Sequence, residues 1–85
     1  MPLYYFHVHN SLGFTRDEEG QELPDVGAAL DVAVRSARSL LASEVSEGRV
    51  DLRGRIEVTD EAGGSVLALP FADAIVLLTG DPPDT

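Results

Sequence analysis

The feature that most constrains this fold is one long stretch with a helical period. From Val26 to Glu47, apolar residues recur every three or four positions, and this spacing predicts a single amphipathic helix. Asp25 stands where an N-cap is expected, and Gly48 stands where a helix commonly ends. The stripe predicted to face the core consists of Val26, Ala29, Leu30, Ala33, Ala37, Leu40 and Leu41. Because three of these side chains are alanine, the helix axis can lie close to a sheet.

The segment before the helix has the two-residue period of a strand. Leu3 to His9 is rich in aromatic and β-branched residues, which favour strands. Alternation divides this strand into two faces, one with Tyr4, Phe6 and Val8 and the other with Leu3, Tyr5, His7 and His9. Two shorter strands, at 14–16 and 21–23, are expected to pair with each other across a turn in which Gly20 has a positive φ.

The segment after the helix predicts a second hairpin and a short terminal element. Residues 55–60 and 65–69 alternate, and Gly63 or Gly64 is expected to close the turn between them with a positive φ. Residues 71–78 fit either a short helix or an edge strand. We expect a short helix at the start of this segment.

A chain of 85 residues builds a single domain. We expect that domain to span residues 1–80, followed by a flexible, acidic, proline-containing tail at 81–85. The simplest fold is α+β: an antiparallel sheet of three to five strands with one long helix packed on one face, plus a short C-terminal element. The predicted core combines Leu30, Ala33, Ala37, Leu40 and Leu41 of the helix with Phe6, Val8, Ile56 and Val58 of the strands.

The strands carry more apolar rows than one helix can cover. Some of these side chains are therefore expected to face outward, and exposed apolar patches commonly mark interfaces. We expect self-association, for which a two-fold dimer is the commonest arrangement. The partner-binding candidates are Tyr5, His7, Leu67, Leu69 and Ile75, the last as part of the apolar segment 75–78.

The charge balance narrows the classes of partner. Fifteen acidic residues oppose six arginines, for a net charge of -9, which repels both nucleic acids and anionic lipid surfaces. A basic partner protein would instead be attracted. The longest apolar run, from Ala74 to Leu78, is too short to cross a membrane. The absence of cysteine fits a reducing compartment, and we expect a cytoplasmic protein.

Two histidines suggest a metal site. His7 and His9 form an H-x-H pair on one face of a strand, a spacing that can supply two ligands. A third ligand, such as Asp17 or Glu19, would have to be brought in by the fold. We expect that the pair does not hold a transition metal.

No motif predicts catalysis. The arginines at positions 49, 53 and 55 could dock an anion, but the acids in the same stretch favour local salt bridges. The helical serines lie outside any nucleophile elbow, and the glycines at 63 and 64 lack the strand-to-helix context of a phosphate loop. The sequence predicts neither an enzyme nor a cofactor.

An ordered set of short motifs resembles a known family. The set comprises Tyr4-Tyr5-Phe6-His7-Val8, Asp17-Glu18-Glu19-Gly20 with Glu22-Leu23-Pro24-Asp25, the alanine-rich helix, and Arg55-Ile56-Glu57-Val58-Thr59-Asp60-Glu61 with Gly63. Together these motifs resemble the small alphaproteobacterial domain of unknown function 6894, over residues 3 to 75. The resemblance implies a bacterial cytosolic protein and transfers no catalytic residues. The order of elements is also similar to that of HicB-type antitoxins, which neutralise a basic toxin.

Two hypotheses for function follow. The first is a non-enzymatic interaction module, homodimeric, that binds a partner protein of basic charge. The alternative is a small-molecule or metal-binding protein that uses the strand face of Tyr5, His7 and His9.

Overall fold

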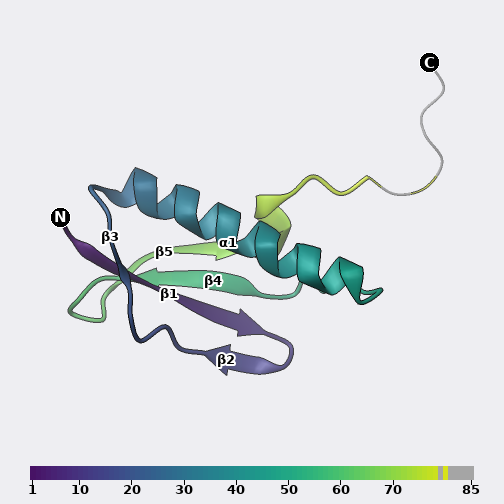
Figure 1. The fold of residues 1–85 in the computed structure, drawn as a ribbon, viewed down its shortest axis with the longest axis horizontal. Helices are drawn as coiled ribbons and strands as arrows, with labels where there is room; N and C mark the ends of the chain where they lie inside the picture. Colours follow the sequence, from purple (N-terminus) through teal and green to yellow (C-terminus); the bar gives the residue numbers. More distant parts are fainter. Residues whose placement is uncertain (79, 81–85) are drawn as a thin grey trace, which may run out of the picture.

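The computed structural model describes residues 1–78 and residue 80, and it has the predicted α+β architecture (Figure 1). The elements in chain order are β1 (Leu3–Asn10), β2 (Gly13–Thr15), β3 (Gln21–Glu22), α1 (Val26–Ser46), β4 (Arg55–Thr59), β5 (Ser65–Pro70) and the 3-10 helix η1 (Phe71–Ala74). The predicted tail at 81–85 lies outside the described residues.

The five strands form one antiparallel sheet in the order β2-β1-β4-β5, with β3 also paired to β1. The register sets Phe6 opposite Val58 and His7 opposite Glu57. The helix α1 packs against β4, β5 and η1, and it lies across one face of the sheet (Figure 1). Its start is capped as predicted, because the Asp25 side chain accepts a hydrogen bond from the Ala28 N–H.

The buried line along α1 differs from the predicted stripe. Val26, Leu30 and Leu40 are 47%, 42% and 41% exposed, so their predicted place on the core-facing stripe is wrong. The buried residues of the helix are Ala29, Val32, Ala33, Ala37 and Leu41. Four of these form an i to i+4 row, and such a row is inclined to the helix axis. Leu30, near the start, and Leu40, near the end, fall on opposite sides of that inclined row.

The strand side of the core agrees with the prediction. Ile56 and Val58 are fully buried, and Phe6 and Val8 are partly buried against the same cluster. The rest of the cluster comes from β1, α1, β5 and η1: Tyr4, Ala29, Ala33, Ala37, Leu41, Leu69, Phe71 and Ala74. The three long strands, β1, β4 and β5, therefore contribute residues to the helix-covered face, as their two-residue period requires.

The predicted hairpin between residues 14–16 and 21–23 does not form. Instead, β2 and β3 both pair with β1, β2 through residues 8–10 and β3 through residues 3 and 4. Residues 16–20 form a loop along the edge of β1 rather than a turn between two strands. Gly20 nevertheless has the predicted positive φ, of 74°, and Gly63 in the β4–β5 hairpin has a φ of 83°.

The C-terminal segment is a single 3-10 turn, shorter than the 71–78 element considered from the sequence. Phe71 and Ala74 of η1 are buried, and the chain becomes extended again at Ile75. Leu67 and Leu69 were expected to face outward, but both pack on the helix side of the sheet, Leu69 within the core. Within the described part of the chain, no helix has the length and apolar character needed to span a bilayer.

Candidate functional site

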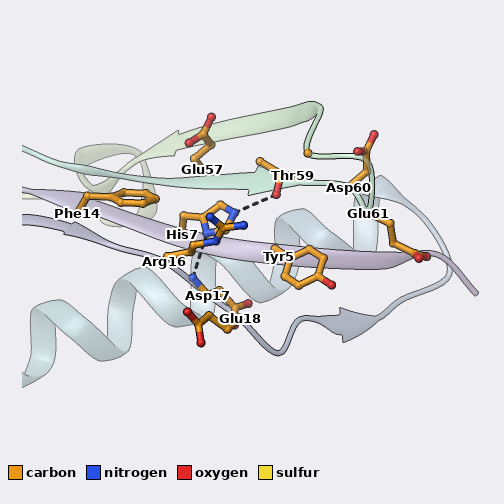
Figure 2. Close-up of a pocket in the computed structure, with 11 residues that line it drawn as sticks. Tyr5, His7, Phe14, Arg16, Asp17, Glu18, Glu57, Thr59, Asp60 and Glu61 are labelled. Carbon is orange, nitrogen blue, oxygen red and sulfur yellow. Dashed lines mark hydrogen bonds between the residues drawn. The ribbon is translucent and has the colours of Figure 1, made fainter.

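In the part of the chain that the structure describes, no element packs over the sheet face opposite α1, and we call this the open face. Its central side chains are Tyr5, His7 and His9 of β1, Phe14 of β2, and Glu57 and Thr59 of β4. Figure 2 shows most of these side chains projecting from the sheet toward the viewer, with α1 behind it. The strand period explains the set, because every second residue of β1 and β4 must point away from the helix.

The aromatic rings of the open face form a continuous row. Tyr5 and His7 are stacked with parallel planes, at a centroid distance of 6.3 Å. Phe14 lies against both histidines, with its centroid 5.8 Å from that of His7 and 4.6 Å from that of His9. The pairing of His9 with Phe14 across β1 and β2 accounts for the second contact. The row presents a broad aromatic surface that starts at Tyr5 and ends at His9.

His7 is held at both ring nitrogens, although it lies on the outer face of the sheet. Its Nδ1 accepts a hydrogen bond of 3.0 Å from the backbone N–H of Asp17. Because a backbone N–H can only donate, Nδ1 carries no proton, and Nε2–H donates to Thr59 Oγ1 at 3.0 Å (Figure 2). The side chain is 8% exposed. A metal ion at His7 would have to displace one of these two hydrogen bonds.

His9 is positioned differently. Its Nε2 lies 3.0 Å from Glu57 Oε1, and both side chains remain partly exposed. The hydrogen bond with His9 lowers the pKa of Glu57, against a smaller effect of burial, and the nearby positive charges act in the same direction as that bond. Among residues 1–78 and 80, no three histidines or acids come together as a metal-binding group. The expectation of no tight metal binding stays a prediction.

Asp17 bridges the gap between β2 and β3. Its Oδ2 accepts from the Phe6 N–H at 3.0 Å, at a point where β1 has no strand partner on that edge. Its Oδ1 accepts from the N–H groups of Glu19 at 3.1 Å and Gly20 at 3.3 Å. Partial burial opposes the charged form, but the three backbone donors outweigh it and lower the pKa of Asp17.

The sequence predicted no role of this kind for Asp17. An aspartate that accepts from the N–H groups two and three residues later forms an Asx turn, and the run Asp17-Glu18-Glu19-Gly20 is compatible with one. That local signal was present. The long-range bonds to Phe6 and His7 could be known only from the fold.

Acidic groups surround the aromatic row. A cavity of about 490 Å³, open to solvent, lies between the β4–β5 hairpin and the loop at residues 16–20. It is lined by Tyr5, His7, Phe14, Arg16, Asp17, Glu18, Glu57, Thr59, Asp60, Glu61 and Gly63. Five of these residues are acidic and one is an arginine, so the cavity favours cations.

Comparison with known proteins identifies the family. The model of the Domain of unknown function (DUF6894) matches residues 3–72 of the chain. The chain belongs to this family. No curated protein and no solved structure matches it. The predicted family is therefore confirmed, while the likeness to HicB-type antitoxins stays untested.

The DUF6894 region contains the whole open face and its cavity. Of the predicted partner-binding residues, Tyr5 and His7 lie together there. Leu67 and Leu69 lie on the helix-covered face, and Ile75, beyond the family match, is partly buried against the core. The fold thus separates the predicted set into an open-face pair and three residues placed elsewhere.

Two of the three arginines in residues 49–55 of this DUF6894 chain, Arg49 and Arg53, are engaged locally. Asp51 is buried and accepts two hydrogen bonds from the Arg53 guanidinium, at 3.0 and 3.2 Å, and one from Ser11. These bonds, led by that from Arg53, hold the pKa of Asp51 far below its usual value. Arg49 lies 3.7 Å from the same carboxylate. This arrangement fits the local salt bridges favoured by the sequence.

Proposed function

We propose that this protein is a non-enzymatic interaction module whose open face binds a basic segment of a partner protein. One observation carries the proposal: the solvent-accessible rings of the aromatic row, those of Tyr5, Phe14 and His9, lie beside carboxylates and have no element of the described structure packed over them. Both features favour the same ligand chemistry. Guanidinium and ammonium groups bind to aromatic faces and also pair with carboxylates.

The charges of the open face support a partner with several basic side chains. Glu57, Asp60 and Glu61 come from β4 and the hairpin, and Asp17 and Glu18 come from the opposite side of the cavity. A cation above the aromatic row would therefore meet acids on two sides. The net charge of -9 adds long-range attraction, which increases the rate of encounter with a basic protein.

The hydrogen bonds of His7 support a binding role rather than an acid–base role. With Nδ1 occupied by the Asp17 N–H and Nε2 by Thr59, neither nitrogen is left over to accept a proton from a substrate. The ring instead forms a fixed part of the surface between Tyr5 and Phe14. Such prior ordering reduces the entropy lost when a partner binds.

Titration with a synthetic peptide of alternating arginine and glycine residues tests the proposal. The peptide should shift the NMR signals of Tyr5, His7 and Phe14, and added salt should weaken the binding. Combined Glu18→Gln and Glu61→Gln substitutions should weaken it by about ten-fold, since each exposed ion pair contributes up to about 1 kcal/mol. Tyr5→Ala should weaken it further by removing one aromatic face.

The matched controls use the same charge change elsewhere. Glu47 lies at the exposed end of α1 and Asp31 on its exposed side, away from the open face, so combined Glu47→Gln and Asp31→Asn substitutions should leave peptide affinity nearly unchanged. A peptide in which citrulline replaces arginine should bind much more weakly. Equal binding by the two peptides, or signal shifts confined to the helix-covered face, would contradict the proposal.

The alternative proposal is binding of a small cationic molecule in the same cavity. Its volume of about 490 Å³ favours this alternative, since it lies within the range typical of ligand pockets. The two proposals differ in how affinity depends on ligand length. A protein-binding face should bind peptides more tightly as the number of arginines grows, whereas a small-molecule site should bind argininamide as well as any peptide.

We also propose that the protein is cytoplasmic, and its cysteine-free composition agrees with that location.

A further inference from the structure

The two edges of the sheet are protected to very different degrees. On one side, β2 and β3 are only three and two residues long, and the Asp17 loop interrupts them. The loop places four consecutive charged residues, 16–19, along this edge. Short edge strands, interruptions and charges are the devices by which proteins prevent edge-to-edge pairing.

The other edge has fewer of these devices: β5 carries one bulge, where its register with β4 shifts between Val58 and Thr59, and it ends in Pro70. β5 is six residues long, Ser65–Pro70, and it contains no charged side chain. It is the last strand in the sheet order, and within residues 1–78 and 80 no strand or loop backbone pairs with its outer side. An edge of this kind presents a row of free N–H and C=O groups that another strand can bind.

An exposed apolar segment lies next to this edge along the chain. Beyond η1, Val76, Leu77 and Leu78 are 85%, 58% and 89% exposed. Figure 1 shows the segment leaving η1, at the end of β5, without returning to the sheet. Three such side chains expose roughly a few hundred Å² of apolar surface, which on monomers commonly marks an interface.

We infer that β5 pairs with β5 of a second copy of the chain, with the segments 76–78 covering part of the same interface. A second copy is the fitting occupant because an edge strand complements itself about a two-fold axis. The charge distribution points the same way. Two chains of net charge -9 repel each other least where the contacting surface carries no charge, and β5 is such a surface. Nothing in β5 would select a basic partner.

The pairing has a geometric consequence for the open face. A two-fold axis perpendicular to the plane of the joined sheet keeps the same face of both copies on the same side. Both α1 helices would therefore cover one side of the joined sheet. Both open faces would then lie together on the other side and would remain accessible. The dimer would present two copies of the basic-segment site, which increases the avidity for a partner with repeated basic segments.

Ala68 offers a direct test of the pairing. Its side chain is exposed and lies opposite Glu57 on β4, so a lysine there is tolerated by the single chain. In the paired edge, residues directly opposite share a face, so a two-fold axis that passes near the middle of β5 sets Ala68 opposite or diagonal to its counterpart in the second copy. Ala68→Lys therefore brings two like charges together. The matched control is Ala42→Lys on the exposed side of α1, which makes the same change in net charge.

Sedimentation velocity of the full chain, without any ligand, gives the readout. The wild type and Ala42→Lys should sediment at twice the chain mass of 9.1 kDa at micromolar to millimolar concentration. Ala68→Lys should raise the dissociation constant several-fold, because like charges facing each other across strands are destabilising. Circular dichroism checks that each variant is folded. A wild type that stays at 9.1 kDa throughout, or an Ala68→Lys chain that dimerises as well as Ala42→Lys, would overturn the inference.

Hydrogen exchange of the wild type tests the same interface without a substitution. Amides of β5 that face away from β4 should exchange more slowly as the protein concentration rises, while amides in the loop at residues 16–20 should not change. Concentration-dependent protection that spares β5 would place the contact elsewhere and would also overturn the inference. Because neither measurement uses a basic peptide, the outcome is independent of the function proposed for the open face.

Discussion

The two faces of the sheet are organised by different forces. On the helix-covered face, alanines at positions 29, 33 and 37 bring α1 against Ile56 and Val58, and all five side chains are fully buried. On the open face, aromatic and polar side chains keep their places through hydrogen bonds, above all those that join His7, Thr59 and Asp17. The helix-covered face depends on the close packing of apolar side chains, and the open face depends on hydrogen bonds between side chains and backbone. Substitutions should therefore affect the two faces in different ways.

The largest effect is expected on the helix-covered face, at Leu41. Leu41 is 4% exposed whereas its neighbour Leu40 is 41% exposed, so the two leucines form a matched pair. Leu41→Ala should lower the free energy of unfolding by about 2–5 kcal/mol, the range for a buried leucine that leaves a cavity. Leu40→Ala should cost less than about 1 kcal/mol, because solvent already reaches that side chain. Urea denaturation of both variants measures the two free energies of unfolding. Equal losses of stability would show that the inclined row of α1 does not pack against the sheet.

An intermediate effect is expected on the open face, at Asp17. Asp17→Ala removes the acceptor for three backbone N–H groups, and a hydrogen bond to a charged group contributes about 1.5–3 kcal/mol. Since the aspartate is partly exposed and water replaces some of these bonds, we expect a loss of about 1–2 kcal/mol. The neighbouring Glu18 makes no hydrogen bond in the described structure, so Glu18→Ala is the control.

The Asp17→Ala variant also tests whether the two faces lose protection from exchange independently. Because Asp17 holds the loop at residues 16–20 against β1, Asp17→Ala should also speed hydrogen exchange at Phe6 while leaving α1 protected. Uniform loss of protection across both faces would mean that the open face is not a separate unit of local stability.

The smallest expected effect is a loss of stability at low pH. The folded-state pKa values of Asp17, Asp51 and Glu57 are lowered from ordinary values of 3.8, 3.8 and 4.5. A lowered pKa means that the folded state favours the charged form. The stabilisation is therefore complete above about pH 5 and is lost as the pH falls through the ordinary values toward the folded ones. None of these acids lies in the helix-covered core.

Thermal unfolding followed from pH 6 to pH 2 measures this dependence. The melting temperature should fall most steeply below about pH 4, and Asp51→Asn should flatten the curve more than a substitution at the exposed Glu61. An unchanged slope in Asp51→Asn would show that its contacts with Arg53 and Ser11 do not contribute in solution.

Local patterns were sufficient to predict most of the elements. The period of residues 26–47, with its cap at Asp25 and its end before Gly48, predicted α1 to within one residue at its C-terminal end. The alternation in 3–9, 55–60 and 65–69 predicted the three main strands and the assignment of Phe6, Val8, Ile56 and Val58 to one face. Each of these predictions depends on residues close together in the chain, where the period of the backbone determines direction.

The tertiary structure alone decided how those elements meet. The helical period could not show that the buried row is inclined, because that depends on how α1 crosses a twisted sheet, and Leu30 and Leu40 were misassigned for this reason. The residues at 14–16 and 21–23 looked like partners because they are near in sequence. They pair with β1 instead, and Asp17 supplies the acceptor for the β1 N–H in the gap between them.

On the open face, too, some features follow from local sequence and others only from the tertiary structure. Its aromatic and histidine side chains could be assigned to one strand face from the alternation of residues 3–9. The hydrogen bonds that fix His7 join residues 10 and 52 positions away, and the acids around the cavity come from two distant segments, residues 17–18 and 57–61. Local sequence determines which way a side chain points from its own backbone. Which groups it meets there depends on chain segments that only folding brings together, and for this protein those segments decide the chemistry of the site.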